Sequence, residues 1–413
     1  MAPAAIPNLD FFYPEPGMRL NGGRFELLNH VGSGQYSTAW LAVDLAVSYA
    51  FPLAVSSDDL NKCCSSEDLK YAVVKILTRT ATVEHRSGRM NELAFHKSIK
   101  GDHSVRNVSK VTDDFEVQGP SGPHLCLVFY PLGLDVTSIR KAAPNKALKP
   151  HIVQKIICDV LSGLVSLHDR KIIHTDIKSS NILAEGFDNN LACERYLADH
   201  SFQIVGEFNL EGEQRFIYAV QSLPTPSPCL WNMSPYDHEL YSYCLIDLGY
   251  GQWVGQQLTV DVFGPLALRA PEVVIGSNFG PRLDVWAVGC LAFELLVGEW
   301  LFNPIGEGDD WTVEADLLAQ IFAVTGQRFS PQALSRAQRK DGILDAEGNL
   351  LRKKEPPHTS IEERLASANI LTEKEVKSAA GFIRKCLTVE YLDRPTSEEA
   401  ATDDWVFGWE CNH

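Results

Sequence analysis

The stretch HTDIKSSNIL holds the side chains best suited to chemistry, because it places His174, Asp176, Lys178 and Asn181 within eight residues. A carboxylate such as Asp176 can accept the proton of a hydroxyl group, and Lys178 can neutralise an anion beside it. Asn181 and Asp247, the latter in the later sequence IDLG, offer the hard oxygen ligands that Mg²⁺ prefers. Together these residue types suit the positioning and charge stabilisation that the transfer of a charged group requires.

The spacing His-x-Asp-x-Lys-x-x-Asn is typical of a protein-kinase catalytic loop. In a chain of 413 residues, four specified residues would match by chance about a few times in a thousand. The order of the other motifs strengthens the interpretation, because chance does not supply such a series. Along the chain these are Gly32-Ser33-Gly34, Lys75, Glu92, the catalytic loop, Asp247-Leu248-Gly249, Ala270-Pro271-Glu272, Asp284 and Arg394.

Phosphoryl transfer from ATP asks a protein mainly for positioning and charge stabilisation. In this interpretation Asp176 orients the substrate hydroxyl and Lys178 lies beside the γ-phosphate, while Glu92 holds Lys75 on the α- and β-phosphates. Asn181 and Asp247 would bind Mg²⁺. The predicted ATP-binding residues are Val31, Gly32, Ser33, Gly34, Val73, Lys75, Phe129, Tyr130 and Leu132.

Each motif also has a plainer interpretation when it is taken alone. Gly32-Ser33-Gly34 could be only a hairpin turn, and the third glycine of the usual pattern is Ser37. Asp247 before a glycine is often a turn residue. Four further residues are predicted to be structural: His174 in the core, Asp284 holding the catalytic-loop backbone, and Glu272 with Arg394 as a buried ion pair.

Periodicity predicts the elements that carry these residues. Residues 24–43 alternate apolar and polar side chains around the glycines, which predicts a hairpin, and YAVVKIL and HLCLVFYPLG predict further strands. Residues 83–99 read as one helix, and HIVQKIICDVLSGLVSLHDR and DVWAVGCLAFELLVG as long apolar helices. We therefore expect an α+β, bilobal protein-kinase fold with a β-rich N-lobe and a mainly helical C-lobe. The expected parts are an extension at 1–19, an N-lobe at 20–131, a C-lobe at 132–407 with a spacer inserted at about 187–241, and a tail at 408–413.

Composition narrows the function classes. The chain has 53 acidic and 37 basic residues, a formal charge of −16, which argues against nucleic-acid binding. The ten cysteines form no CxxC pair and read as reduced thiols of an intracellular protein. We see neither a secretory signal nor a stretch long enough to span a membrane, and we expect a monomer.

Beyond the shared motifs, the sequence resembles the SR protein kinases, the serine kinases of Arg/Ser-rich splicing factors, from about residue 20 to 405. The likeness is carried by GSGQYSTAWLA, by HTDIK with Thr175 in place of arginine, by DLGYGQWV, and by GEGDDWTVEADLLAQIFAVTG with ILDAEGNLLRKKEP. The spacer between Asn181 and Asp247 also resembles that family's, although it is shorter, and we expect a divergent fungal member.

The resemblance implies an ATP- and Mg²⁺-dependent serine/threonine kinase of Arg/Ser-rich proteins such as splicing factors, in cytoplasm and nucleus. It also implies a docking groove for arginine-rich substrate, lined here by Asp309, Asp310, Glu314 and Asp316, although a solvated acidic helix start is the plainer interpretation. Kinases with arginine at the position of Thr175 often use it to bind an activation-loop phosphate. We therefore expect activity without such phosphorylation.

Three departures from the family pattern leave other functions open. Val73 replaces the usual alanine above the adenine, and His96 replaces the usual apolar residue four positions after Glu92. The sequence FGPLALRAPE differs from the family's substrate-proximal loop. The alternatives are a catalytically weak or silent kinase-fold scaffold that binds basic partners, and a small-molecule phosphotransferase, which the Ala-Pro-Glu motif argues against.

Overall fold

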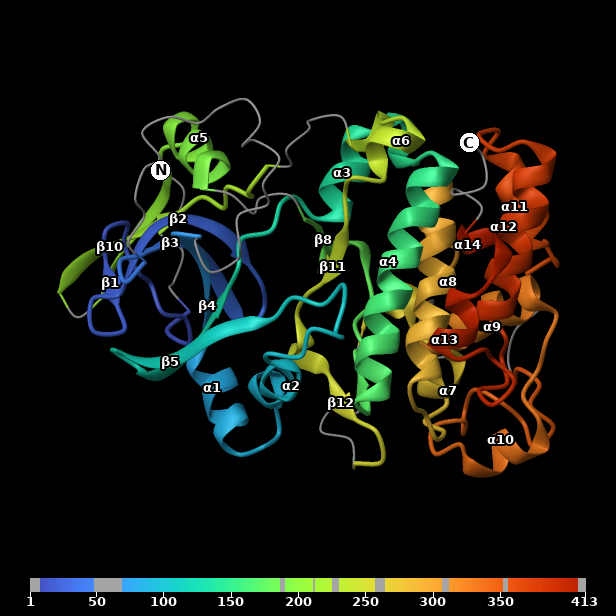
Figure 1. Ribbon diagram of the computed structural model, residues 1–413. Coiled ribbons are helices and arrows are strands. Elements are labelled where there is room, and N and C mark those ends of the chain that lie inside the picture. Colours follow the sequence, from blue (N-terminus) through green and yellow to red (C-terminus); the bar gives the residue numbers. More distant parts are fainter. Residues whose placement is uncertain are drawn as a thin grey trace. The chain divides into compact units, whose positions relative to one another are not determined.

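The computed structural model describes residues 8–47, 69–185, 190–210, 212–224, 230–256, 264–306, 312–351 and 356–407. The described residues cluster into two compact units. The first unit comprises Met1–Gly101, Ser109–Leu134 and Ala184–Pro228, and the second comprises Asp102–Val108, Asp135–Leu183 and Cys229–His413. The first unit is built on a β-sheet and the second is mainly helical, as the sequence predicts (Figure 1).

A six-stranded antiparallel sheet organises the first unit, in the strand order β1-β2-β3-β4-β6-β5. Its strands are β1 Arg19–Leu20, β2 Phe25–Ser33, β3 Ser37–Asp44, β4 Tyr71–Leu77, β5 Val111–Gly119 and β6 Gly122–Phe129. The β2–β3 hairpin turns at the predicted glycines, and β4 and β6 match the two other predicted strands. Lys75 of β4 is paired in register with Ala39 of β3 and Leu127 of β6.

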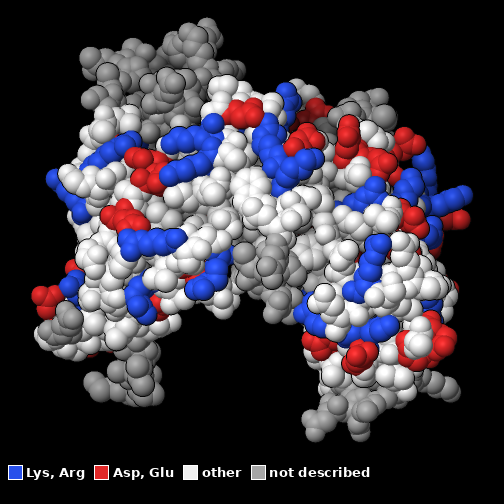
Figure 2. All heavy atoms as spheres, turned by 90° about the horizontal axis from the view of Figure 1, so that it is seen from below, with Lys and Arg blue, Asp and Glu red and all other residues white. Residues whose placement is uncertain are grey.

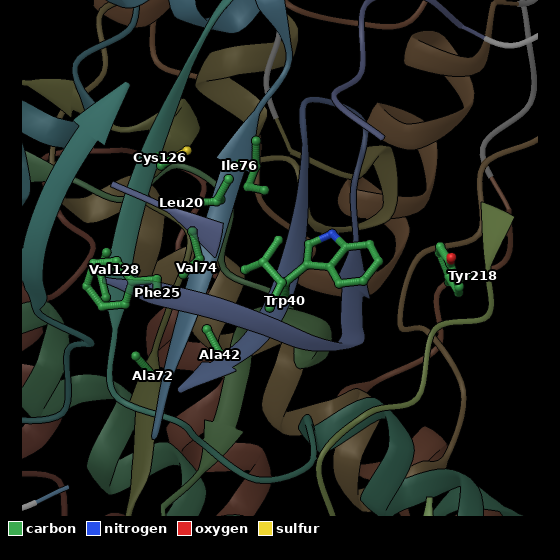
Figure 3. Close-up of a cluster of buried hydrophobic side chains, with 11 residues drawn as sticks. Leu20, Phe25, Trp40, Ala42, Ala72, Val74, Ile76, Cys126, Val128 and Tyr218 are labelled. Atoms are coloured by element: carbon green, nitrogen blue, oxygen red, sulfur yellow. The ribbon is translucent and has the colours of Figure 1, made fainter. Parts of the chain in front are cut away.

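One face of this sheet carries a cluster of buried apolar side chains (Figure 3). Trp40, Val74 and Val128 project from three different strands, and Tyr218 reaches Trp40 from β10, with ring centroids 5.8 Å apart. Alternation places every second residue of β3 and β4 on this face. The alternating apolar residues of the sequence are therefore the side chains that form this core.

The predicted helix at residues 83–99 is wrong, because the structure has two helices there, α1 Arg79–Arg86 and α2 Glu92–Ile99. Thr78 caps the start of α1, and Gly88 follows its end with φ of 75°. Glycine enters this left-handed region at little cost, so it ends the helix where apolar periodicity alone suggests continuation. The break leaves Glu92 in the first turn of α2.

The spacer also differs from the expectation of an insert in the C-lobe. Its described first part forms α5 Asn190–Asp199, β9 Ile204–Leu210 and β10 Glu213–Tyr218, and it clusters with the first unit. Cys193, Tyr196 and Leu223 pack on Leu41 and Tyr71 of the sheet. Hydrogen bonds fix the segment further, because the Asn29 side chain donates to the His200 carbonyl (2.8 Å).

The second unit holds most of the helices (Figure 1). Two short strand pairs flank the catalytic loop: β8 Ile182–Ala184 with β11 Tyr243–Leu245, and β7 Ile172–Ile173 with β12 Gln252–Trp253. The helices are α3 Val136–Ala142, α4 Pro150–Asp169, α6 Pro235–His238, α7 Pro271–Val274, α8 Arg282–Val297, α9 Val313–Thr325, α10 Pro331–Arg336, α11 Ile361–Ser367, α12 Glu373–Cys386, α13 Ser397–Ala401 and α14 Asp404–Phe407.

The two long predicted helices, α4 and α8, lie side by side at the centre of this unit (Figure 1). Residues Leu283 to Leu296 of α8 are all buried, which explains why its sequence is apolar on every side. Among the described residues, Pro144–Asp169 alone has the length and mean hydropathy of a membrane span, and 67% of its most apolar 18-residue window is buried inside the protein. This burial is what a central core helix requires.

Residues 102–108, expected in the N-lobe, cluster with the second unit instead. The side-chain amide of Asn107 donates to the Tyr243 carbonyl (2.9 Å), and Leu245 N donates to the Asn107 carbonyl (2.8 Å). Val108 forms an isolated parallel bridge to Leu245. These contacts attach the segment to β11, and no local sequence pattern predicts them.

Candidate active site

The predicted catalytic loop runs from β7 to β8 and is almost completely buried. Asp176 is 2% exposed, and its Oδ2 accepts hydrogen bonds from Lys178 Nζ (2.7 Å) and Asn181 Nδ2 (2.8 Å). The other carboxylate oxygen, Oδ1, has no hydrogen-bond partner among the described residues. The structure thus gathers three of the predicted residues around one carboxylate and leaves one of its oxygens available to a substrate.

The backbone of this loop is held by Asp284 from the first turn of α8, as predicted. The two Asp284 oxygens accept hydrogen bonds from the amides of His174 (2.8 Å) and Thr175 (2.8 Å). Thr175 has φ of 68°, a conformation that costs a non-glycine residue about 1 kcal/mol or more. Because Asp284 is fully buried, its charge-assisted hydrogen bonds can maintain this strained conformation.

His174 is fully buried and makes structural contacts on both ring nitrogens. Its Nδ1 accepts from the Asp176 amide (3.3 Å), which leaves Nε2 to donate to the Ile246 carbonyl (3.1 Å). The ring therefore connects Asp176 to the strand that precedes Asp247.

Asn181 and Asp247 are brought together by the β8–β11 pair. Ile246 N donates to the Asn181 carbonyl (3.0 Å), so Asp247 follows directly after a backbone contact with Asn181. The Asn181 amide nitrogen is occupied by Asp176, so its amide oxygen faces away from that bond as a free acceptor among the described residues. Asp247 has φ of 65° and accepts from Gly249 N (3.3 Å). An amide oxygen and a carboxylate are a suitable donor set for Mg²⁺.

The residue that replaces the usual arginine, Thr175, makes a contact of its own. Its hydroxyl donates to the carbonyl of Tyr250 (2.8 Å), in the sequence that follows Asp247. Gly264 lies on the other side with φ of 73°, where a Cβ would come within 3.1 Å of the Thr175 carbonyl. The unusual Gly264-Pro265 sequence therefore permits a close approach to the catalytic loop.

The first unit contains the predicted ion pair between Lys75 and Glu92, with Lys75 Nζ 2.5 Å from Glu92 Oε1. The Glu92 side chain is 1% exposed. Burial raises the pKa of this carboxyl, but the Lys75 ammonium and the His96 ring outweigh burial and lower the pKa to about 2. The pair is therefore charged at neutral pH.

The remaining predicted nucleotide residues lie on this sheet or close to the ends of its strands. Val73 of β4 is in register with Phe129 of β6, and both are half-buried. Val31 and Gly32 are half-buried near the end of β2, whereas Ser33 and Gly34 at the turn are exposed. Tyr130, which is exposed, and Leu132, which is half-buried, follow β6 and lie outside the sheet.

A Cβ on Gly34 would meet nothing closer than 3.9 Å, and its φ is not in the left-handed region. The fold itself therefore does not require glycine at this position. A glycine there leaves the backbone accessible to a ligand, which is the use the sequence predicts for it.

Glu272 and Arg394 form the predicted buried pair. Two short hydrogen bonds join them, Nη1 to Oε1 (2.7 Å) and Nη2 to Oε2 (2.8 Å), and Arg394 is fully buried. Arg394 also donates to the carbonyls of Thr388 (2.9 Å) and Arg282 (3.0 Å). The pair ties α7, which follows Gly264-Pro265, to the chain before α13.

The structure describes two of the four proposed docking acids. Asp309 and Asp310 lie outside the described residues, and Glu314 and Asp316 are in the first turn of α9. Asp316 accepts hydrogen bonds from Ile305 N (2.8 Å) and the Gln320 side chain (2.8 Å). Asp316 thus has a structural task, and Glu314 is the better candidate for docking.

Sequence reasoning missed His168, which completes the Asp284 arrangement. Its Nε2 lies 3.0 Å from Asp284 Oδ2, and its Nδ1 lies 2.8 Å from the Ser397 hydroxyl. A histidine near the end of an apolar helix carries no signal of such a contact, because Asp284 is 116 residues away. The replacement of arginine by Thr175 likewise gives no sequence signal that its hydroxyl donates to the Tyr250 carbonyl.

Comparisons with known proteins agree with this geometry. The family model described as "Protein kinase domain" matches residues 57–198 and 237–406. The serine/threonine-protein kinase SRPK of Physarum polycephalum is 24% identical over 383 residues, covering 91% of this chain and 84% of that protein. SRSF protein kinase 3 of Mus musculus is 21% identical over 454 residues, covering 78% and 76%. The resemblance to the SR protein kinases is therefore confirmed.

The fold is also similar to a solved kinase structure. A crystal structure of a kinase domain superposes with a TM-score of 0.63, at 18% identity, and covers 97% of this chain and 100% of that one. At this identity the likeness shows the fold alone. It agrees with the expected α+β class.

Proposed function

Because this chain belongs to the protein kinase family, and its relatives are named serine/threonine-protein kinases, we propose that it phosphorylates serines of Arg/Ser-rich proteins. The observation that carries the proposal is the arrangement around Asp176, together with relatives named as SRPK and SRSF kinases. ATP is the phosphoryl donor of the family, and we infer that Mg²⁺ accompanies it.

In this proposal Asp176 Oδ1 accepts the hydrogen of the serine hydroxyl and directs its oxygen toward the γ-phosphorus. Lys178 and Asn181 both bind the other oxygen, so the carboxylate is held in one orientation. Lys178 is 31% exposed and carries a positive charge beside this carboxylate, where it can stabilise charge on the transferred group. A strong hydroxyl base is not needed for such a reaction.

Asn181 and Asp247 would hold Mg²⁺, which supplies positive charge to the phosphate oxygens when it is bound. Lys75 would bind the α- and β-phosphates. Its pair with Glu92 is already formed, so the lysine needs no rearrangement to take up that position. This pair argues against the alternative of a silent scaffold.

The activity can be tested with radiolabelled ATP and three substrates: an Arg/Ser-repeat peptide, a generic basic protein, and none. We expect the wild type to prefer the Arg/Ser peptide, and Asp176→Asn to lose at least about 100-fold in kcat. Equal labelling by the wild type and Asp176→Asn would indicate the scaffold alternative. Equal use of the two substrates would refute the Arg/Ser specificity and leave the kinase activity intact.

The excess of acid gives a physical reason for choosing a basic substrate. On the face shown in Figure 2, acidic and basic side chains are mixed, so the formal charge of −16 is not gathered there in one patch. Recognition of arginine must therefore use local groups. Glu314 is half-buried at the start of α9, where its charge also acts on the partly buried Arg269.

Charge reversal tests this docking proposal. Glu314→Lys should raise the KM for the Arg/Ser peptide about three- to tenfold and leave the KM for ATP unchanged. Glu398→Lys is the matched control, because Glu398 is an exposed first-turn acid of α13 in the same unit. Equal effects of the two reversals would refute a specific role of Glu314.

We also propose a cytoplasmic and nuclear location, which fluorescence microscopy of the tagged protein tests.

A further inference from the structure

His96 is an unusual residue of the N-lobe motifs that the proposed function does not explain. It lies on α2, one helical turn after Glu92, and is 1% exposed. Its ring packs edge-on against Phe129 of β6, with centroids 5.1 Å apart. An apolar side chain would fill this position without introducing two polar nitrogens into the core.

Neither ring nitrogen of His96 has a hydrogen-bond partner among the described residues. The same holds for Oε2 of Glu92, whose other oxygen is bound by Lys75. His96 Nε2 lies 3.9 Å from Glu92 Oε1, too far for a hydrogen bond but within reach of a small rotation. An imidazole with two unpaired nitrogens is therefore buried beside a carboxylate that has one unpaired oxygen.

Such an arrangement is costly, because each unpaired buried polar group loses its hydrogen bonds to water. Buried polar atoms in folded proteins are nearly always paired. A shift of about 1 Å in the Glu92 carboxylate or the imidazole would bring Nε2 within hydrogen-bond distance of Oε1 and give that nitrogen a partner. The bond to Lys75 can remain while it forms, because each carboxylate oxygen can accept more than one hydrogen bond.

We propose that His96 is a positioning residue, which donates a hydrogen bond from Nε2 to the Glu92 carboxylate and so holds Glu92 on Lys75. The inference rests on the kinase activity and goes beyond it, because His96 touches neither ATP nor substrate in this role. It explains why an imidazole occupies an otherwise apolar site.

Other charged groups also lie around Glu92. Lys75 of β4 and the half-buried His85 of α1 both act on this carboxylate, and burial lowers the pKa of His85. On β5, Asp114 is paired with Lys97 of α2 (3.2 Å). A hydrogen bond from His96 would therefore add to the ion pair with Lys75 and would not replace it.

The test compares His96→Leu with His96→Gln, which keeps an amide donor near the position of Nε2. The readouts are the affinity for ADP with Mg²⁺, measured by calorimetry, kcat with the generic basic protein at several pH values, and Tm. His96→Leu should lose about tenfold in kcat, corresponding to about 1.4 kcal/mol, with an equal or higher Tm because it removes two unpaired polar atoms. His96→Gln should regain most of that activity.

His124→Leu is the matched control, since His124 is another buried histidine of the first unit, bound through Nδ1 to the Leu77 carbonyl (2.8 Å). It should lower Tm and leave kcat per folded molecule unchanged. A His96→Leu variant as active as the wild type, with unchanged ADP affinity, would overturn the proposal. A wild type that binds ADP but phosphorylates nothing would refute the kinase function instead, while ADP affinity would still decide the role of His96.

Discussion

Removing the charge of Glu272 is the perturbation whose cost the structure defines best. Arg394 is fully buried, and Glu272 accepts two of its hydrogen bonds at 2.7 and 2.8 Å. In Glu272→Gln the guanidinium would remain buried without a counter-charge. Breaking a buried pair from one side typically costs about 3–5 kcal/mol, because the remaining ion is left uncompensated.

The other contacts of Arg394 limit how far the protein can adapt. Its guanidinium lies over the Trp286 ring, 5.1 Å from the centroid, and donates to the carbonyls of Thr388 and Arg282. The side chain therefore cannot swing into water without leaving these groups unpaired. We expect Glu272→Gln to lose about 3–5 kcal/mol of unfolding free energy.

The matched control is the exposed pair of Arg384 and Glu362 in the same unit, whose side chains are 51% and 37% exposed. Water screens these charges, so Glu362→Gln should cost about 1 kcal/mol or less. The two variants remove the same chemical group and differ mainly in burial.

Urea unfolding followed by tryptophan fluorescence measures both losses, and circular dichroism checks that the transitions coincide. The double variant Glu272→Leu with Arg394→Met should be more stable than Glu272→Gln, because it removes both charges. Equal small losses for Glu272→Gln and Glu362→Gln would refute the reasoning that burial decides the cost.

Three further outcomes are expected. Gly34→Ala should raise the KM for ATP several-fold without lowering Tm, since the fold leaves room for a Cβ; an unchanged KM would contradict close approach of the nucleotide. The bacterially expressed protein should keep its activity after phosphatase treatment, and inactivation by the phosphatase would refute activity without activation-loop phosphorylation. Thr175→Val should lose activity, because it lacks the hydrogen bond to the Tyr250 carbonyl. The pKa of Glu92 is lowered to about 2, so its pair with Lys75 contributes fully above about pH 5 and is lost only as pH falls toward 2. Activity of the wild type measured from about pH 5 to 8 should therefore show no acid limb from Glu92.

Local patterns predicted the elements and residues that depend on nearby sequence. The β2–β3 hairpin, β4, β6, α4 and α8 follow from apolar period and turn residues, which act over a few positions. The Asp176 loop was recognisable because its spacing is short and because the other motifs follow in a set order. The α+β class came from the same patterns.

The same local patterns predict α1 and α2 as one helix, because apolar side chains continue through the break and only Gly88 marks it. A glycine inside a periodic segment is ambiguous until the chain on both sides has packed. The position of Glu92 in a first turn depends on this break.

By itself, therefore, the sequence determined the chemistry that this protein can carry and the class of its fold. Tertiary structure alone decided that the first part of the spacer packs on the sheet beside Leu41, that Asp316 serves the fold, and that His96 lies unpaired beside Glu92. The physical reason is range: motif spacing and periodicity act between neighbours, whereas these contacts depend on burial and on hydrogen bonds that exist only after distant segments have come together.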